Sequence, residues 1–290
     1  MHFVPFTGNN FAGRLVSLKS GMEYFHGYSK KEFDRLLRQA EFLSFKVFEG
    51  VNFKPGTIIL EPGCGVGAQT RILLRKFPDI KIIAVDRSQN AIEAAKSNFP
   101  EDLKSRVEFH CADIYDFHPA VQADGIFICW MLEHVHEPLA MIKHLLKFLK
   151  PGGFFMATEV QNNSLQVYPH LPALDTYWNA YNLLQEQLGG DPFVGLKVPS
   201  LLEKALPGGF EKIQVMPGLF LNDLRNPEAL KNMSTYWLDL MESTRENLES
   251  KGLVDSTIFP EIKRVMEQHH RNADALFSYT FVQTTAYLLE

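Results

Sequence analysis

This sequence of 290 residues has few cysteines, no long apolar run and no excess of positive charge. The longest uninterrupted apolar run, from Ile126 to Leu132, has seven residues, whereas a membrane-spanning helix needs about twenty. The first ten residues lack the basic segment followed by an apolar segment that marks a secretory signal. These absences predict a chain with no membrane span and no secretory leader.

Cysteine content and net charge narrow the class of protein further. The three cysteines, Cys64, Cys111 and Cys129, form no CxxC motif and are odd in number, which is typical of a reducing compartment. The net charge of -5, from 29 Lys and Arg against 34 Asp and Glu, argues against a general polyanion-binding surface. We therefore expect a cytoplasmic protein that does not bind nucleic acid.

Short apolar runs alternate with helical stretches through the first 160 residues. The runs are rich in β-branched residues and lack polar alternation, which is typical of strands buried on both faces of a sheet. They lie at Thr57–Leu60, Lys81–Val85, Val107–Cys111, Gly125–Cys129 and Phe154–Thr158. Helical periodicity occupies residues 69–77, 89–99 and 138–149 between them. This alternation predicts right-handed βαβ units and a doubly wound parallel sheet.

The remaining segments predict additions to this core. A capping box at Ser29–Glu32 begins a helix that reaches Gly50. Residues 160–208 are mostly helical in pattern, and strand-like runs return at residues 210–221 and 276–289. The helical insertions follow strands, so they emerge at the carboxyl edge of the sheet, where open α/β sheets bind ligands. We expect them to cover a binding site.

A glycine-rich loop at residues 61–68, with the sequence EPGCGVGA, joins the first predicted strand to the next helix. Glycines allow a tight turn and a close approach of the backbone to a ligand, and the helix N-terminus offers N–H groups to an anion. The pattern Gly63-x-Gly65-x-x-Ala68 satisfies the dinucleotide fingerprint, with Asp86 at the end of the second strand as the ribose partner. A nicotinamide-dependent dehydrogenase is therefore one candidate.

Two further acidic residues favour a cationic ligand instead. Glu61 precedes the first glycine by two positions, where it would repel a pyrophosphate but attract a sulfonium or an ammonium group. Asp113 closes the third strand, where a carboxylate can accept a hydrogen bond from an adenine amino group. Glu61, Asp86 and Asp113 thus lie at the carboxyl ends of adjacent strands, in one crevice.

Together these motifs resemble those of the class I S-adenosylmethionine-dependent methyltransferases. The loop, Asp86, Asp113 and the LKPGG turn at residues 149–153 match that family in order and spacing. Within the family the chain is similar to the small-molecule branch that includes ubiquinone/menaquinone-type enzymes. The resemblance implies an α/β, Rossmann-like, doubly wound sheet of seven mostly parallel strands, with the last strand antiparallel and helical lid insertions. It implies N-terminal cap helices at 1–50, an S-adenosylmethionine-binding core at 51–160, a helical lid at 161–208, and the last two strands at 209–290 with a second insertion at 222–275.

The resemblance also implies S-adenosylmethionine as cofactor and assigns its contacts. The loop would cradle the methionine part, Asp86 would accept from both ribose hydroxyls, and Asp113 would accept from the adenine amino group. Thr70 is expected either to reach the carboxylate of the cofactor or to bond its own helix backbone. The expected cofactor-binding residues are Tyr24, Tyr28, Glu61, Gly63, Cys64, Gly65, Gly67, Thr70, Asp86, Arg87, Ala112, Asp113, Ile114, Cys129 and Trp130.

The methyl acceptor is expected to be a small, partly hydrophobic molecule. After the fourth strand the chain lacks the Asn/Asp-Pro-Pro-aromatic motif with which family members methylate amino groups of nucleic acids. It also lacks the metal-binding aspartate of catechol-type enzymes, and we expect no metal. Aromatic residues in the insertions would supply apolar walls with polar tips. The expected lid residues are Tyr168, Tyr177, Trp178, Tyr181 and Trp237.

His134 follows the fourth strand and is the best-placed titratable residue for catalysis. It is either a general base for a hydroxyl acceptor or an anchor for the loop or the cofactor. The predicted reaction is SN2 transfer of a methyl group, which depends on holding the acceptor in line and needs no protein nucleophile. The alternatives are a protein of this fold that binds the cofactor without transfer, and an NAD-dependent oxidoreductase.

Overall fold

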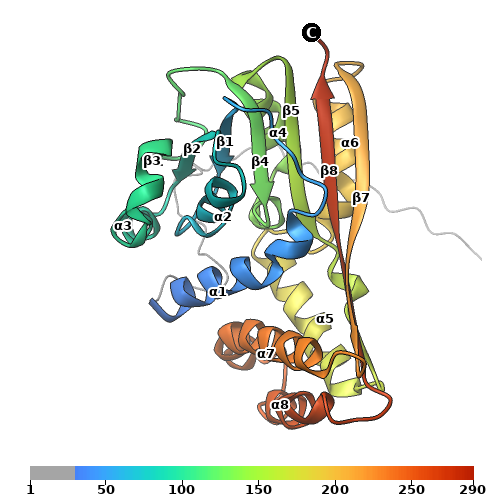
Figure 1. Cartoon of the computed structure of the whole chain (residues 1–290). Coiled ribbons are helices and arrows are strands. Elements are labelled where there is room, and N and C mark those ends of the chain that lie inside the picture. The colour runs from blue at the N-terminus through green and yellow to red at the C-terminus, as the bar shows by residue number, and fades with distance from the viewer. Residues whose placement is uncertain (1–29) are drawn as a thin grey trace, which may run out of the picture.

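The computed structural model describes residues 30–290, and Figure 1 shows a sheet flanked by helices with further helices beyond one end. The α-helices are α1 (Lys30–Val47), α2 (Ala68–Lys76), α3 (Gln89–Asn98), α4 (Pro138–Leu145), α5 (Pro172–Gln187), α6 (Val194–Ala205), α7 (Pro227–Ser250) and α8 (Ile258–His269). The strands are β1 (Ile58–Pro62), β2 (Lys81–Asp86), β3 (Val107–Cys111), β4 (Ala123–Cys129), β5 (Leu149–Val160), β6 (Gln166–Tyr168), β7 (Phe210–Asp223) and β8 (Leu276–Leu288).

The sheet has the parallel core that the sequence predicts. Its strand order is β3-β2-β1-β4-β5-β8-β6, and β7 pairs with β8. Neighbouring strands among β1 to β5 are parallel, whereas β8 runs antiparallel to β5, β6 and β7. The predicted α/β fold with an antiparallel last strand is therefore confirmed. The additional strand β6 has three residues, too few to show a periodic pattern in the sequence.

Each central strand sends successive side chains to opposite faces of the sheet, as the pleat requires. Ile59 and Phe127 belong to one buried cluster, while their neighbours Leu60 and Ile128 belong to another. The first cluster includes buried residues of α1 and α2, and the second includes those of α4 and α6. Both faces are therefore covered, which explains why these strands lack polar alternation.

Helices α5, α7 and α8 form a helical cap beyond the carboxyl ends of the parallel strands, reached by the long pair β7 and β8 (Figure 1). The hydroxyl of Tyr177 on α5 donates to the carbonyl of Met241 on α7 at 2.6 Å, and its ring packs against Phe259 on α8. Helix α6 packs instead on α4, β5 and β8. The segment predicted as a lid, 161–208, thus gives one helix to the cap and one to the layer that covers the sheet.

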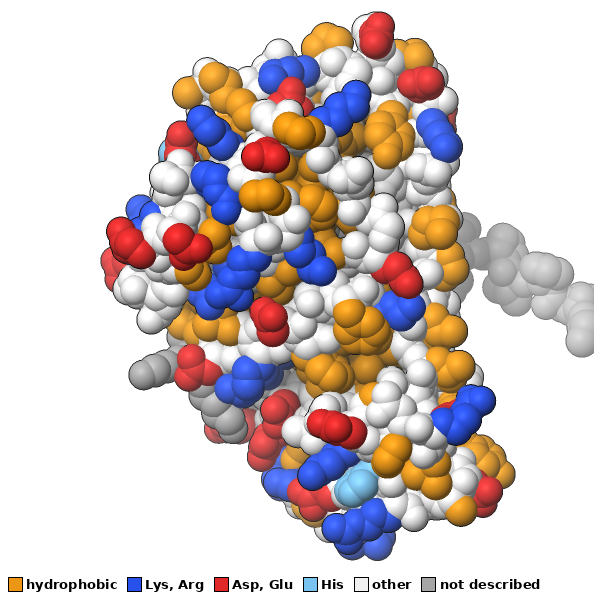
Figure 2. Space-filling model, in the orientation of Figure 1, with side chains coloured by type: hydrophobic (Ala, Val, Ile, Leu, Met, Phe, Trp, Pro, Cys, Tyr) orange, Lys and Arg blue, Asp and Glu red, His pale blue; other side chains and the backbone are white. Residues whose placement is uncertain are grey.

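The surface shows no single-sign patch on the face drawn in Figure 2, where Lys and Arg lie among Asp and Glu. Among the described strands, β7 pairs only with β8 and forms an edge of the sheet. It exposes Val215, Met216, Leu219 and Leu221, so this edge is apolar. Within residues 30–290, no helix combines the length and the apolar character needed to cross a membrane.

Candidate active site

A cavity of about 1030 Å³ opens at the carboxyl edge of the sheet. Its floor is the glycine loop and the ends of β2 and β4, and its walls come from α1, α5 and α7. Pockets for one small molecule usually measure about 300–1,000 Å³. The cavity is therefore large enough to hold two small ligands side by side.

The glycine loop lines the floor of this cavity in a conformation that requires glycine. Gly63, Gly65 and Gly67 have φ angles of 69°, 52° and 71°, in the left-handed region that other residues avoid. A Cβ atom at Gly63 would lie 2.5 Å from Cγ of Met131, and one at Gly67 would press on the ring of Phe109. A Cβ atom at Gly65 would meet no protein atom within 4 Å. Gly65 therefore opens its backbone to the cavity.

Asp86, at the end of β2, holds this loop in place. Its Oδ2 accepts from the backbone N–H of Gly65 at 2.8 Å, and its Oδ1 accepts from that of Ser88 at 2.8 Å. A carboxylate has about four acceptor sites, so both oxygens keep capacity for ligand hydroxyls. Asp86 thus shapes the loop and faces the cavity together with Arg87.

Glu61 is a buried carboxylate in the cavity lining. Its Oε2 accepts from the hydroxyl of Thr70 at 2.7 Å. Burial, opposed by this hydrogen bond and assisted by Asp86, raises the pKa of Glu61 to about 8. Burial penalises the ionised form of Glu61, and a cationic group bound beside it would favour that form and pair with it. Thr70 itself lies outside the cavity lining, and its hydroxyl is occupied by Glu61.

This buried carboxylate gives a testable pH dependence. In the unfolded chain Glu61 ionises near its ordinary value of 4.5, whereas in the folded protein its pKa is about 8. The unfolded state therefore loses the proton first, and the free energy of unfolding should fall by more than about 1 kcal/mol as the pH rises from 4.5 to 8. Urea denaturation across this range should show a flatter dependence for Glu61→Gln than for the wild type. An equal slope in both proteins would contradict the assignment.

The turn after β3 lines the cavity with Ala112, Asp113 and Ile114. Oδ1 of Asp113 accepts from the N–H of Tyr115 at 2.9 Å, and a ring nitrogen of His144 lies 2.9 Å from the carbonyl oxygen of Ile114. These contacts fix the turn after β3 while Asp113 stays exposed. Asp113 and Asp86 thus line one side of the same cavity, as the sequence predicts.

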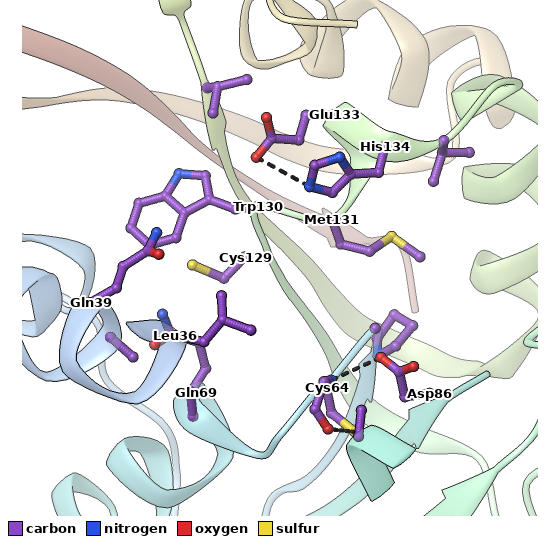
Figure 3. A pocket seen from close by; sticks show the side chains of 18 of the residues that line it. Leu36, Gln39, Cys64, Gln69, Asp86, Cys129, Trp130, Met131, Glu133 and His134 are labelled. Atoms are coloured by element: carbon purple, nitrogen blue, oxygen red, sulfur yellow. Dashed lines mark hydrogen bonds and ion pairs between the residues drawn. The ribbon is translucent and has the colours of Figure 1, made fainter. Parts of the chain in front are cut away.

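The segment after β4 forms the opposite wall, and Trp130 is its most unusual residue. Trp130 has φ of 53° and is the one non-glycine residue with positive φ in the described part of the chain. Such a conformation costs about 1–2 kcal/mol and commonly marks a functional site. Its N–H donates to the carbonyl oxygen of Thr158 at 2.9 Å. Cys129 and Trp130 both line the cavity (Figure 3).

Glu159 holds the turn that follows Trp130, a role that the sequence analysis missed. Its Oε1 accepts from the N–H groups of Met131 at 3.0 Å and Leu132 at 2.8 Å, and its Oε2 accepts from that of Glu133 at 3.3 Å. The residue is fully buried, and burial raises its pKa to about 8. Glu159 lies at the carboxyl end of β5, so the rule that identified Asp86 would have found it.

His134 and Glu133 project from this turn into the cavity and face each other (Figure 3). Nε2 of His134 lies 3.8 Å from Oε1 of Glu133, and Oε2 of Glu133 accepts from Nε2 of Gln185 on α5 at 2.8 Å. Burial raises the pKa of Glu133, while His134, Gln185 and Arg35 lower it. The helical cap therefore braces the pair directly.

The cavity contains most of the predicted residues but not all of them. Trp178, Tyr181 and Trp237 line it, with Trp178 stacked on Tyr181 at a centroid distance of 4.5 Å. Tyr168 is exposed on β6, and Tyr177 is fully buried in the cap; neither lines the cavity. Gly67 also lies outside the lining, behind the loop. Tyr24 and Tyr28 lie outside the described residues. The lining adds polar residues that the sequence analysis did not single out, Arg35, Gln39, Gln69, Glu133, Asn162, Tyr236 and Tyr279.

The donor and acceptor groups of the cavity fit S-adenosylmethionine. Asp86 offers acceptors to ribose hydroxyls, Asp113 offers one to an adenine amino group, and Glu61 offers a buried carboxyl group whose ionised form an ammonium group would stabilise. Gly65 leaves room for a ligand against the loop backbone. Within residues 30–290 no cluster of three or more His, Cys, Asp or Glu side chains is arranged to hold a metal ion.

Comparisons with known proteins agree with this chemistry. Residues 59–153 match the model of a family described as "Methyltransferase domain". The chain is 37% identical over 114 residues to malonyl-[acyl-carrier protein] O-methyltransferase of Priestia megaterium, and this match covers 39% of this chain and 40% of that protein. It is 29% identical over 173 residues to ubiquinone biosynthesis O-methyltransferase of Coxiella burnetii, and this match covers 59% of this chain and 70% of that protein. The chain thus spans about two fifths of the first curated relative.

A solved structure shows the same fold over most of the chain. Phosphoethanolamine N-methyltransferase 2 of Haemonchus contortus, in complex with phosphomonomethylethanolamine and S-adenosylhomocysteine, superposes with a TM-score of 0.55 and 14% identity. The match covers 92% of this chain and 61% of that protein. The family match favours a methyltransferase over the dinucleotide-dependent dehydrogenase that the glycine pattern alone allowed. Residues 59–153 therefore match a methyltransferase domain, and the chain shares its fold with a methyltransferase of known structure.

Proposed function

We propose that the protein transfers the methyl group of S-adenosylmethionine to a small, partly hydrophobic molecule. The observation that carries the proposal is the extent of the cavity, which continues from Asp86 past Cys129 and Trp130 to Trp237 on α7. The cofactor, when bound, supplies an electrophilic methyl group for SN2 transfer. The part of the cavity beyond Trp130, towards α5 and α7, is then left for the acceptor.

This acceptor compartment has apolar and aromatic walls. Strand β7 contributes Phe220, and α7 contributes Leu240. Trp237 packs against the rings of Trp178 and Tyr279, with centroid distances of 5.1 Å and 4.6 Å. Aromatic walls bury a planar or apolar body and exclude water. They support an acceptor with an apolar part whose reacting atom lies near Cys129 and His134.

The residues of this compartment support transfer by positioning rather than by covalent catalysis. Burial raises the pKa of the Cys129 thiol well above its usual value, so a thiolate is not available there as a nucleophile. The turn that carries His134 is fixed by the three backbone hydrogen bonds to Glu159. Holding two reactants in line provides a large part of the rate enhancement in such bimolecular reactions.

His134 is proposed as the base for an acceptor hydroxyl. A proton taken onto its ring would be stabilised by the charge of Glu133, 3.8 Å away. We expect His134→Gln to lower kcat and to leave the affinity for S-adenosylhomocysteine unchanged. His136→Gln, a change at the neighbouring cavity histidine, is the matched control. Equal kcat for His134→Gln and the wild type would remove His134 from the reaction.

The transfer itself can be tested without knowing the acceptor. Purified protein is incubated with S-adenosylmethionine carrying a labelled methyl group and with a panel of phenols, carboxylic acids, thiols and amines that each bear an apolar arm. The proposal expects S-adenosylhomocysteine release together with labelled product for at least one class. Calorimetric binding of S-adenosylhomocysteine with no transfer to any of them would favour a cofactor-binding protein, and binding of NAD alone would contradict the cofactor.

A further inference from the structure

Three polar residues on α1 form a connected network at the edge of the cavity. The guanidinium of Arg35 donates from Nε and Nη2 to the two carboxylate oxygens of Glu32, at 2.8 Å and 2.6 Å. Its Nη1 donates to Oε1 of Gln39 at 2.7 Å. Arg35 and Glu32 are 7% and 4% exposed. A buried ion pair of this kind contributes little stability compared with apolar residues of the same volume, so its value lies in what it positions.

The network fixes the orientation of the Gln39 side chain. A guanidinium has only donors, so the amide oxygen of Gln39 must face Arg35 and the amide NH₂ group must point the other way. The charge of Arg35 also polarises the amide and strengthens its N–H groups as donors. Gln39 lines the cavity, and no hydrogen bond from its NH₂ group to another described residue is present. The network therefore presents an oriented donor to a ligand.

The position of Gln39 identifies which part of a ligand it meets. In Figure 3, Gln39 lies on the opposite side of Cys64 and Cys129 from Asp86. Asp86 and Asp113 provide the acceptors for the nucleoside, so the amino-acid end of the cofactor extends away from them, towards α1 and the start of α2. That end carries an ammonium group, which suits the buried Glu61, and a carboxylate, which needs donors.

Besides Arg35, whose guanidinium already donates to the two other residues of the α1 network, few side chains can serve the carboxylate at this end. The hydroxyl of Thr70 already donates to Glu61, which removes the donor that the sequence suggested for this role. Gln69 lines the same end of the cavity, but its Oε1 is buried without a hydrogen-bond partner, so no contact fixes its amide. Gln39 is the donor whose orientation is set in advance.

We propose that Gln39, oriented by Arg35 and Glu32, binds the α-carboxylate of the methionyl part of the cofactor. The inference rests on the proposed function only for the identity of the cofactor. It makes Gln39 a binding residue, and Arg35 and Glu32 positioning residues. A preoriented amide loses little side-chain entropy on binding, which is an advantage over a free glutamine.

Calorimetry with two ligands tests the proposal on the full chain. S-adenosylhomocysteine carries the carboxylate, whereas 5′-methylthioadenosine has the same nucleoside and sulfur but no amino-acid part. Gln39→Leu should weaken the binding of S-adenosylhomocysteine about 10-fold or more, because one hydrogen bond to a charged group is lost. The affinity for 5′-methylthioadenosine should stay unchanged. Gln39→Glu keeps an acceptor for Arg35 but adds a negative charge beside the ligand carboxylate, so it should weaken the binding of S-adenosylhomocysteine further.

Arg38→Leu, a change on the exposed face of the same helix, is the matched control and should alter neither affinity. Equal weakening of both ligands by Gln39→Leu would mean a structural role and would overturn the proposal, as would no change in either. A raised KM for an acceptor with unchanged affinity for S-adenosylhomocysteine would assign Gln39 to the acceptor instead. Failure of the wild type to bind S-adenosylhomocysteine would reject the cofactor itself, whereas binding without methyl transfer would reject only the proposed function.

Discussion

Replacing Asp86 with alanine is expected to weaken the binding of S-adenosylhomocysteine about 1000-fold. Two effects combine in this one substitution. The ribose loses a charged acceptor for two hydroxyls, and each such hydrogen bond is worth about 1.5–3 kcal/mol. The loop also loses the bond from the N–H of Gly65 to Oδ2 of Asp86, so the backbone that faces the ligand is no longer held to β2. Isothermal titration calorimetry measures the loss directly.

Two variants separate the ribose contact from a general effect on folding. Asp86→Asn keeps one carbonyl oxygen but turns an NH₂ group towards a backbone N–H, so an intermediate loss of affinity is expected. Asp79→Ala, at an exposed turn before β2, should bind as the wild type does. Unchanged affinity in a well-folded Asp86→Ala protein would reject the assignment of the nucleoside site.

Asp86 also shows why much of this site can be predicted from the sequence. The runs around residues 57–60 and 81–85 are short, β-branched and without polar alternation, and they form adjacent parallel strands with residues of both faces buried. A parallel sheet brings the carboxyl ends of its strands to one edge. Acidic residues that follow such runs are therefore predictable neighbours, although they are distant in sequence.

Glu159 and Gln39 show where the prediction stops. The position of Glu159 at the end of β5 follows from the strand pattern, but its role does not. Its partners are backbone N–H groups 26 to 28 residues earlier in the chain, and no side-chain pattern encodes that contact. Gln39 is one polar residue among apolar ones on the face of α1 that lines the cavity. Only the three-dimensional contact with Arg35 shows that its amide is fixed, because hydrogen-bond direction is not a property of the sequence.

The sequence could not identify which of the aromatic lid residues line the cavity, for a related reason. Tyr177 and Trp178 are adjacent on α5, yet Tyr177 is enclosed by α7 and α8 while Trp178 lines the cavity. Consecutive helix positions point about 100° apart, so the choice depends on where the partner helices lie. The sequence predicts an aromatic insertion but does not determine which ring faces the ligand.

Gly65→Ala is expected to weaken cofactor binding about 100-fold while the protein stays folded. Gly65 has φ of 52°, and an added Cβ atom would meet no protein atom within 4 Å. The folded state therefore pays only the backbone cost of a left-handed alanine, about 1–2 kcal/mol. The same Cβ atom would occupy the space through which the loop backbone approaches the ligand. The affinity for S-adenosylhomocysteine should fall about 100-fold, since overpacking a fitted contact costs up to about 3 kcal/mol.

Gly56→Ala is the matched control because Gly56 also has positive φ, 82°, with no atom within 4 Å of an added Cβ. It lies in the turn before β1, away from the cavity lining. Both variants carry the same kind of backbone strain, so thermal denaturation should show similar losses of stability. Only Gly65→Ala should lose the ligand, because only there does the empty space belong to the binding site. Equal affinity in the two variants would mean that the space above Gly65 is not where the cofactor binds.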